Sequence, residues 1–234
     1  MNIALILSGG TGARLGAGIP KQYIEIGGRP IISYCIETLS ECAGIDFIWI
    51  AADKRWHKLI IRGMEQSPAA LAKFKGFTVP GENRQLSIVN GLEEIGRDAS
   101  AEDYVLIHDA ARPLVSGRQI EAVLRGAAGY DGAIPVLPVK DTLYASEDGR
   151  RISALLKRRE IFAGQAPEAF VLGKYHEANR RLTREELLEI NGSTEPAVIA
   201  GMKIRMLAGD ERNFKLTTME DLERFRGIAE KRAE

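Results

Sequence analysis

Short apolar runs recur along the chain. Most are rich in Ile, Val and Leu, as expected of strands that are covered on both faces. These runs are Asn2–Leu7, Phe47–Ala51, Phe77–Val79, Tyr104–Ile107 and Ala133–Val136. Stretches with the apolar spacing of amphipathic helices lie between them, near 30–43, 54–73, 84–95 and 117–128. Because strands that alternate with helices pair in parallel through right-handed crossovers, we expect a doubly wound, mostly parallel α/β sheet in three α/β/α layers.

The alternation breaks after Val136. In residues 138–160 two β-like stretches flank Glu147-Asp148-Gly149, which is typical of a hairpin turn. A two-stranded ribbon is marginal alone in water, so we expect a projecting β-arm that packs on another surface, such as a second subunit.

The sequence after residue 170 predicts three more helices and one more strand. The first two helices lie near 171–181 and 183–189, a strand follows at Lys203–Leu207, and a last helix runs from Met219 to about Ala233. Thr218 is the expected N-cap of this last helix, with Asp221 at its third position. No internal repeat, low-complexity tract or linker interrupts the sequence, so residues 1–234 are expected to form a single domain.

Composition narrows the class of protein. The 234 residues are 45% hydrophobic and 27% charged, as in ordinary globular proteins. The 32 Lys and Arg balance 32 Asp and Glu. This balance argues against a non-specific binder of nucleic acid or of a membrane surface, and any anion site must come from local clustering of cations.

The two cysteines and the N-terminus bear on location. On one helix, Cys35 and Cys42 would lie about 10 Å apart along the axis, which is too far for a disulfide. Two free thiols fit a reducing cytoplasm. The apolar run Ile3–Leu7 is too short for a signal peptide or a membrane span. We therefore expect a cytoplasmic protein.

A glycine-rich turn, Ser8–Gly16, follows the first strand. Its glycines are Gly9, Gly10, Gly12 and Gly16. In open parallel sheets ligands bind at the carboxyl ends of strands, and glycines let backbone N–H groups approach phosphate oxygens. This crowding favours an anion nest over a loop that only turns.

The spacing in this turn excludes two common nucleotide motifs. A P-loop needs Gly-Lys-Ser/Thr, but Lys21 follows Pro20. A dinucleotide fingerprint needs G-x-G-x-x-G, and this turn is one residue too long. Two cations, Arg14 and Lys21, favour a triphosphate with a departing pyrophosphate. A dinucleotide-dependent reductase, with Asp53 as its ribose ligand, is kept as an alternative.

Further motifs follow in a fixed order. They are IPKQY after GGTGARLG, Gly81-Glu82-Asn83-Arg84 with Ser87 and Gly91-Leu92, LIHDAARP at 106–113, Asp141-Thr142, Arg158, Gln165-Ala166-Pro167-Glu168, and NFKLTT at 213–218. Together they resemble the 2-C-methyl-D-erythritol 4-phosphate cytidylyltransferases and the related ribitol-5-phosphate cytidylyltransferases. The resemblance extends over nearly the whole chain.

The resemblance implies a fold like that of the nucleotide-diphospho-sugar transferases, and a reaction of CTP with a polyol phosphate that needs Mg²⁺ and releases pyrophosphate. It also implies a homodimer formed through the arm. It implies these roles: Gly10, Gly12, Arg14 and Lys21 at the CTP phosphates; Gly81, Arg84, Ser87 and Ala110 around the nucleoside; Asp109 at Mg²⁺; and Arg112, Thr142, Arg158, Asn191 and Lys215 at the acceptor. We expect Arg14, Lys21, Asp109 and Lys215 to be catalytic.

Simple chemistry supports this reaction independently. The attacking phosphate is largely dianionic near neutral pH, because the second pKa of a phosphomonoester is ~6. No general base is needed, so the lack of an obvious Ser–His or Cys–His pair does not count against an enzyme. The reaction requires that the two substrates are positioned and that their phosphate charges are neutralised. The guanidinium of Arg14 can bind two phosphate oxygens at once, and the ammonium of Lys21 supplies a compact positive charge.

Several of these residues have structural alternatives. Lys21 fits a solvated loop lysine, Arg84 a surface helix residue and Ser87 a serine bonded back within its helix. Asp109 fits a turn cap, although its place after the strand Tyr104–Ile107 favours a metal ligand. Arg158 lies in a cationic run typical of a solvated face, and Lys215 is equally consistent with a structural role. His108 is assigned no catalytic role.

The chain departs from the family pattern in two segments on the acceptor side. Asn191-Gly192 stands where Thr-Asp is usual, with Thr194-Glu195 as a shifted equivalent. Gln165-Ala166-Pro167-Glu168 replaces Gln-Thr-Pro-Gln. On the ordered motifs we expect 2-C-methyl-D-erythritol 4-phosphate as the first acceptor, with ribitol 5-phosphate or another pentitol or sugar phosphate as the second hypothesis. A nucleotide-binding protein without turnover is the third hypothesis.

Overall fold

The computed structural model of the chain describes residues 1–10 and 19–233. In this part of the chain one sheet has the strand order β10-β7-β11-β6-β1-β4-β5, and β12 pairs with β7. Its strands are β1 (Asn2–Leu7), β4 (Phe47–Ala51), β5 (Phe74–Thr78), β6 (Tyr104–Asp109), β7 (Gly132–Pro138), β10 (Phe162–Gly164), β11 (Glu168–Val171) and β12 (Ile204–Ala208). The predicted strands are confirmed, with β5 beginning three residues earlier than predicted.

Most of the sheet is parallel, as predicted. β1 pairs in parallel with β4 and β6, β4 with β5, and β12 with β7. The exceptions are β10 and β11, which run antiparallel to β7, and β11 is also antiparallel to β6. The sequence analysis did not predict these two short strands.

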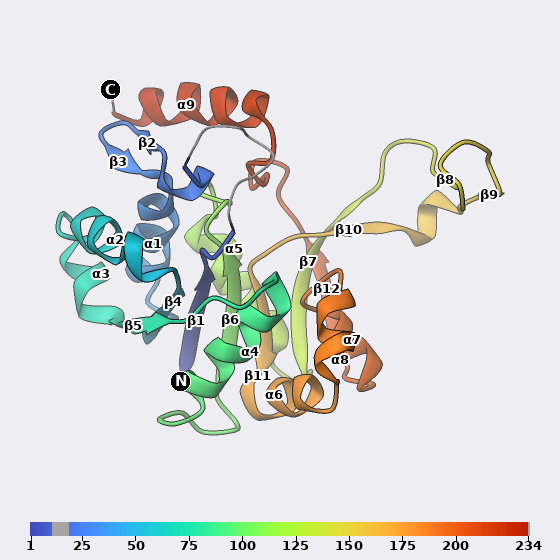
Figure 1. The fold of residues 1–234 in the computed structure, drawn as a ribbon, viewed down its shortest axis with the longest axis horizontal. Coiled ribbons are helices and arrows are strands. Elements are labelled where there is room, and N and C mark those ends of the chain that lie inside the picture. The colour runs from blue at the N-terminus through green and yellow to red at the C-terminus, as the bar shows by residue number, and fades with distance from the viewer. Residues whose placement is uncertain (11–18, 234) are drawn as a thin grey trace.

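Helices cover both faces of the sheet (Figure 1). They are α1 (Ile31–Glu41), α2 (His57–Met64), α3 (Pro68–Lys73), α4 (Arg84–Ile95), α5 (Gly117–Ala127), α6 (Leu172–Arg180), α7 (Arg184–Glu189), α8 (Glu195–Ile199) and α9 (Met219–Ala233). The short helix α8 was not predicted. The predicted cap of α9 is confirmed, because Asp221 N donates to Thr218 Oγ1 at 3.2 Å and Thr218 N donates to Asp221 Oδ2 at 2.9 Å.

The helix predicted over 54–73 is divided. A 3₁₀ turn at Lys54–Trp56 precedes α2, and α3 begins separately at Pro68. Proline suits the first turn of a helix but not its interior. The hydroxyl of Ser67 accepts a hydrogen bond from Ala70 N and starts the second helix.

The alternation of side chains along β1 separates two apolar layers. Ala4 and Ile6 pack in a cluster with residues of α1 and α5. Ile3 and Leu5 belong to the cluster on the other face, with residues of α4 and α6. The α/β/α arrangement therefore follows from the period of two in a strand that is buried on both sides. A third cluster joins α9 to the start of α1 through Phe225 and Ile31.

The arm at 138–160 extends away from the sheet (Figure 1). It contains the antiparallel pair β8 (Tyr144–Ala145) and β9 (Ala154–Leu155). The predicted turn is present: Gly149 has φ +67°, and Asp148 Oδ1 accepts from Arg150 N at 2.8 Å.

Two further sequence expectations concern the cysteines and membrane spans. Cys35 lies in α1 and Cys42 at its end, and both are buried free thiols. Among the described residues, no helix combines the length and the apolar character that crossing a bilayer requires.

Candidate active site

Three parallel strands end together at one edge of the sheet. Leu7 at the end of β1 is in register with Ala51 of β4 and with Asp109 of β6. Ala110 N then donates to the carbonyl oxygen of Leu7 at 3.0 Å. The glycine-rich turn therefore leaves β1 directly beside Asp109.

Hydrogen bonds from the short helix that follows hold the beginning of this turn in place. The short 3₁₀ helix Lys21–Tyr23 packs against it, and Gln22 Nε2 donates to the carbonyl oxygens of Ser8 and Gly10, both at 2.8 Å. Tyr23 Oη donates to Ser8 O at 2.8 Å. Lys21 is half-buried at the start of this helix. Gly12 and Arg14 lie outside the described residues.

A second backbone segment approaches the turn at Pro80-Gly81. A Cβ on Gly9 would lie 2.5 Å from Pro80 Cβ, and one on Gly81 would lie 2.4 Å from Leu86 Cβ, so both positions require glycine. Ser87 Oγ accepts from Gly81 N at 2.9 Å and donates to Asn83 O at 2.8 Å. Ser87 is thus bonded back within α4 and also holds Gly81 beside the turn.

Asp109 lies at the centre of a cluster of cations. Its Oδ1 accepts from Arg84 Nε at 2.9 Å. Its Oδ2 is 2.9 Å from Lys215 Nζ and 3.8 Å from Arg112 Nε. Four of the predicted site residues, Arg84, Asp109, Arg112 and Lys215, are therefore brought together from α4, the end of β6 and the loop before α9.

Asp109 and Arg84 stabilise each other's charge, whereas at Arg112 burial outweighs the nearby carboxylates. Burial alone would raise the pKa of Asp109, but Arg84, Lys215 and Arg112 hold it well below its ordinary value, so the carboxylate stays ionised. Burial acts to lower the pKa of Arg84, yet the carboxylates of Asp109 and Glu168 raise it overall. Burial lowers the pKa of Arg112.

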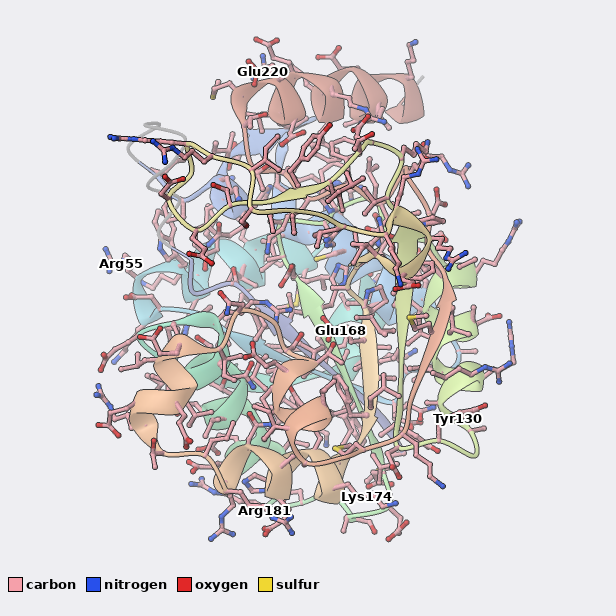
Figure 2. All side chains as sticks on the ribbon, turned by 90° about the vertical axis from the view of Figure 1, so that its right-hand side faces the viewer. Arg55, Tyr130, Glu168, Lys174, Arg181 and Glu220 are labelled. Carbon is pink, nitrogen blue, oxygen red and sulfur yellow. The ribbon has the colours of Figure 1, made fainter. Side chains whose placement is uncertain are left out.

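Glu168 is a second buried carboxylate at this site, and the sequence analysis did not select it as a site residue. Its side chain is buried, and Figure 2 labels it near the middle of the view. Its Oε1 is 3.7 Å from Arg84 Nη2, and its carboxylate accepts from the hydroxyls of Ser193 and Thr194. Burial raises its pKa, and the charge of Arg84 and these hydroxyls oppose that rise. In the sequence, Glu168 stands out only as the last residue of the segment Gln165-Ala166-Pro167-Glu168.

The loop that carries Lys215 is anchored on both sides. Arg112 Nη1 donates to Asn213 O at 2.6 Å, and Asn213 Nδ2 donates to Ala166 O at 2.8 Å. Leu216 N donates to Ala111 O at 2.9 Å. Lys215 is thus held against Asp109 by its neighbours in the chain.

A family model for 2-C-methyl-D-erythritol 4-phosphate cytidylyltransferase matches residues 2–231. The chain belongs to this family. The enzyme of that name from Geobacillus kaustophilus is 34% identical over 225 residues, which cover 94% of this chain and 92% of the relative. The one from Rubrobacter xylanophilus is 35% identical over 221 residues, covering 94% and 91%.

Solved structures of the family share the fold. The Thermus thermophilus 2-C-methyl-D-erythritol 4-phosphate cytidylyltransferase superposes with a TM-score of 0.72 at 26% identity, covering 98% of this chain and all of that one. A 4-diphosphocytidyl-2C-methyl-D-erythritol synthase gives a TM-score of 0.79 at 24% identity, covering 97% and 98%. The expected fold class is therefore confirmed.

Three site residues expected from the family pattern have their recorded contacts elsewhere than at Asp109. Thr142 and Arg158 are exposed on the arm, where Arg158 Nη1 donates to Lys140 O at 2.7 Å. Asn191 is exposed in the segment before α8, and its backbone N donates to Glu195 Oε2 at 2.8 Å. The end of that segment, at Ser193 and Thr194, contacts the cluster through Glu168.

Two other residues have structural positions. His108 is fully buried with Nε2 3.1 Å from Arg112 O, and burial lowers its pKa to about 4, which leaves it neutral near pH 7. Asp53, the ribose ligand in the reductase alternative, caps the 3₁₀ turn that follows β4 by accepting from Arg55 N at 2.9 Å.

The donor chemistry at Asp109 fits one ligand of a magnesium ion. Within residues 1–10 and 19–233, no three His, Cys, Asp or Glu side chains gather as a metal-binding group. Mg²⁺ in nucleotide sites commonly takes one or two carboxylates and completes its shell with substrate phosphates and water. An ionised Asp109 meets that need, although its oxygens also pair with Arg84 and Lys215.

Proposed function

We propose that the chain transfers the cytidylyl group of CTP to 2-C-methyl-D-erythritol 4-phosphate, in the biosynthesis of isoprenoid precursors. A phosphate oxygen of the acceptor attacks the α-phosphorus of CTP, the bond to the β-phosphate oxygen breaks, and pyrophosphate leaves with the bonding electrons. The main support is the Asp109 cluster: three cations stand around one ionised carboxylate at the edge where the glycine-rich turn leaves β1.

The nucleotide would lie along the glycine-rich turn. In this proposal Gly10, Gly12, Arg14 and Lys21 hold the triphosphate. The nucleoside lies against Gly81, Arg84, Ser87 and Ala110. The fastening of Gly10 by Gln22 and of Gly81 by Ser87 supports this placement, because a preorganised backbone presents its N–H groups without further ordering.

The acceptor would lie on the other side of Asp109. Arg112 and Lys215 supply positive charge there, and Asn191 lies on the segment that borders it. The two carboxylates and three cations leave one positive charge in excess. That excess would oppose the repulsion between the triphosphate and a dianionic acceptor, which contributes to the barrier together with the need to position the two substrates.

Magnesium belongs to the proposal through Asp109. When bound, the ion would neutralise negative charge on the phosphates of CTP. Asp109 is the residue that would hold it, and the neighbouring cations keep its carboxylate ionised and ready for that role.

The arm supports a homodimer of single-domain subunits. Tyr144, Ile152 and Leu155 are exposed on it, and an isolated two-stranded ribbon gains by packing on another chain. Thr142 and Arg158 of the partner subunit would then complete the acceptor site, which would explain why they are exposed on the arm here. A cytoplasmic location is supported by the two buried free thiols.

The test is a pyrophosphate-release assay with CTP and a panel of acceptors. The panel contains 2-C-methyl-D-erythritol 4-phosphate, ribitol 5-phosphate and other pentitol and sugar phosphates, compared by kcat/KM. The first acceptor should give the largest value. A larger kcat/KM with ribitol 5-phosphate would make that compound the assigned acceptor. CTP binding without pyrophosphate release from any acceptor would instead favour a nucleotide-binding protein without turnover.

A further inference from the structure

Glu168 joins three parts of the molecule that are distant in sequence. It begins β11 and is in register with Ile107, two residues before Asp109 in β6. Its side chain is only 8% exposed and its Oε1 lies 3.7 Å from Arg84 Nη2 of α4. Arg84 in turn donates from Nε to Asp109 at 2.9 Å. One guanidinium therefore spans the two buried carboxylates.

The same carboxylate holds the segment before α8. Ser193 Oγ is 2.5 Å and 2.6 Å from the two carboxylate oxygens, and Thr194 Oγ1 donates to Oε2 at 2.9 Å. Tyr175 Oη adds an anchor by donating to the backbone carbonyl oxygen of Ser193 at 2.6 Å. The 191–194 segment is thus fixed at its C-terminal half, while Asn191 remains exposed.

The two acceptor-side segments that the sequence analysis singled out are therefore in contact. Glu168 belongs to the first of them, and Ser193 and Thr194 adjoin Asn191-Gly192 in the second. A carboxylate offers two acceptor oxygens, which match two hydroxyl donors. An amide in its place offers one oxygen and an NH₂ group that would face a hydroxyl or the Arg84 guanidinium.

We infer that Glu168 is a positioning residue for the acceptor: it places the 191–194 segment relative to Arg84 and Asp109, beside which the acceptor would bind. This inference rests on the proposed function. Glu168 itself need not touch the acceptor, because its oxygens already receive the hydroxyls of Ser193 and Thr194. Its effect on the acceptor passes through the position of the segment that carries Asn191.

The kinetic test uses Glu168→Gln and Thr194→Val. Glu168→Gln should raise the KM for the acceptor by about 10-fold, as expected for a lost hydrogen bond to a charged group, and leave the KM for CTP within about twofold. Arg84 keeps its bond to Asp109 in this variant, which is why CTP binding should be spared. Thr194→Val should raise the KM for the acceptor by a smaller factor. Thr194→Ser keeps the hydroxyl, so its KM for the acceptor should equal that of the parent chain.

The double variant distinguishes a shared contact from two separate effects. If Thr194 acts through Glu168, the double variant should raise the acceptor KM by less than the product of the single effects. Multiplicative effects, or equal changes in the KM values for acceptor and CTP, would overturn the inference.

Backbone amide exchange provides a measurement that needs no turnover. Amides at 193–197 should exchange faster in Glu168→Gln and Thr194→Val than in the parent chain. Glu177→Gln, an exposed glutamate of α6 paired with Arg181, is the matched control and should leave both exchange and kinetics unchanged. Unchanged exchange in Glu168→Gln would refute the inference. If the parent chain itself shows no turnover, the proposed function fails, and exchange still decides whether Glu168 holds this segment.

Discussion

Replacing Lys215 by methionine removes one cation from the Asp109 cluster and keeps an unbranched side chain of similar length. Lys215 Nζ is 2.9 Å from Asp109 Oδ2, and the lysine side chain is 35% exposed. After the change Asp109 keeps Arg84 at 2.9 Å and Arg112 at 3.8 Å, so no buried charge is left without a partner. The free energy of unfolding should therefore fall by only about 1 kcal/mol, as for a partly exposed ion pair.

The effect on the reaction should be much larger. The variant removes the single excess positive charge of the cluster, in a loop that Leu216 and Asn213 hold in place before substrate arrives. Losing one preorganised group that stabilises developing charge costs about 3–4 kcal/mol in the barrier. The expected kcat is therefore lower by roughly 10²- to 10³-fold.

Two measurements check this reasoning. Pyrophosphate release at saturating CTP and acceptor gives kcat, and urea denaturation gives the free energy of unfolding. Lys203→Met, an exposed lysine next to β12, is the control for the loss of a surface charge and should change neither quantity appreciably. A kcat for Lys215→Met within tenfold of the parent would refute the role of Lys215. So would a loss of activity matched by an equally large loss of stability.

Three further predictions follow from the proposed site. Lys21→Ala and Arg14→Ala should each lower kcat far more than they lower stability, and near-normal turnover of Lys21→Ala would remove that lysine from the phosphate site. Arg158→Ala should mainly raise the acceptor KM, and an unchanged KM would separate the arm from the acceptor. Chelation of divalent ions should abolish pyrophosphate release and added Mg²⁺ should restore it, whereas full turnover in excess chelator would exclude the metal proposed at Asp109.

The parts of the fold that the sequence predicts are those that local pattern determines. β1 and β4 have the predicted bounds, because each is a run of apolar residues covered on both faces. β10 and β11 have only three and four residues, and their pairing with β6 and β7 joins distant parts of the chain. Such strands exist through tertiary contacts, and a short window of sequence holds little signal for them.

In the site, too, local sequence predicts some features, whereas contacts between distant segments could not be predicted. The position of Asp109 at a strand end could be predicted, because carboxyl ends of parallel strands meet at one edge. The pairing of this carboxylate with Arg84, Arg112 and Lys215 could not, since the partners come from three separate elements. Glu168 was visible only as a departure from a motif, because its hydroxyl partners are 25 and 26 residues away.

The two carboxylates explain how a cationic site can exist before any phosphate binds. Arg84 and Lys215 both lie 2.9 Å from Asp109, and without it these two cations would repel each other at close range. Asp109 and Glu168 lose hydration on burial, but they hold the cations in defined positions and leave one positive charge uncompensated. Incoming phosphates then meet cations that are already ordered, so the cost of ordering them falls on folding and not on the reaction.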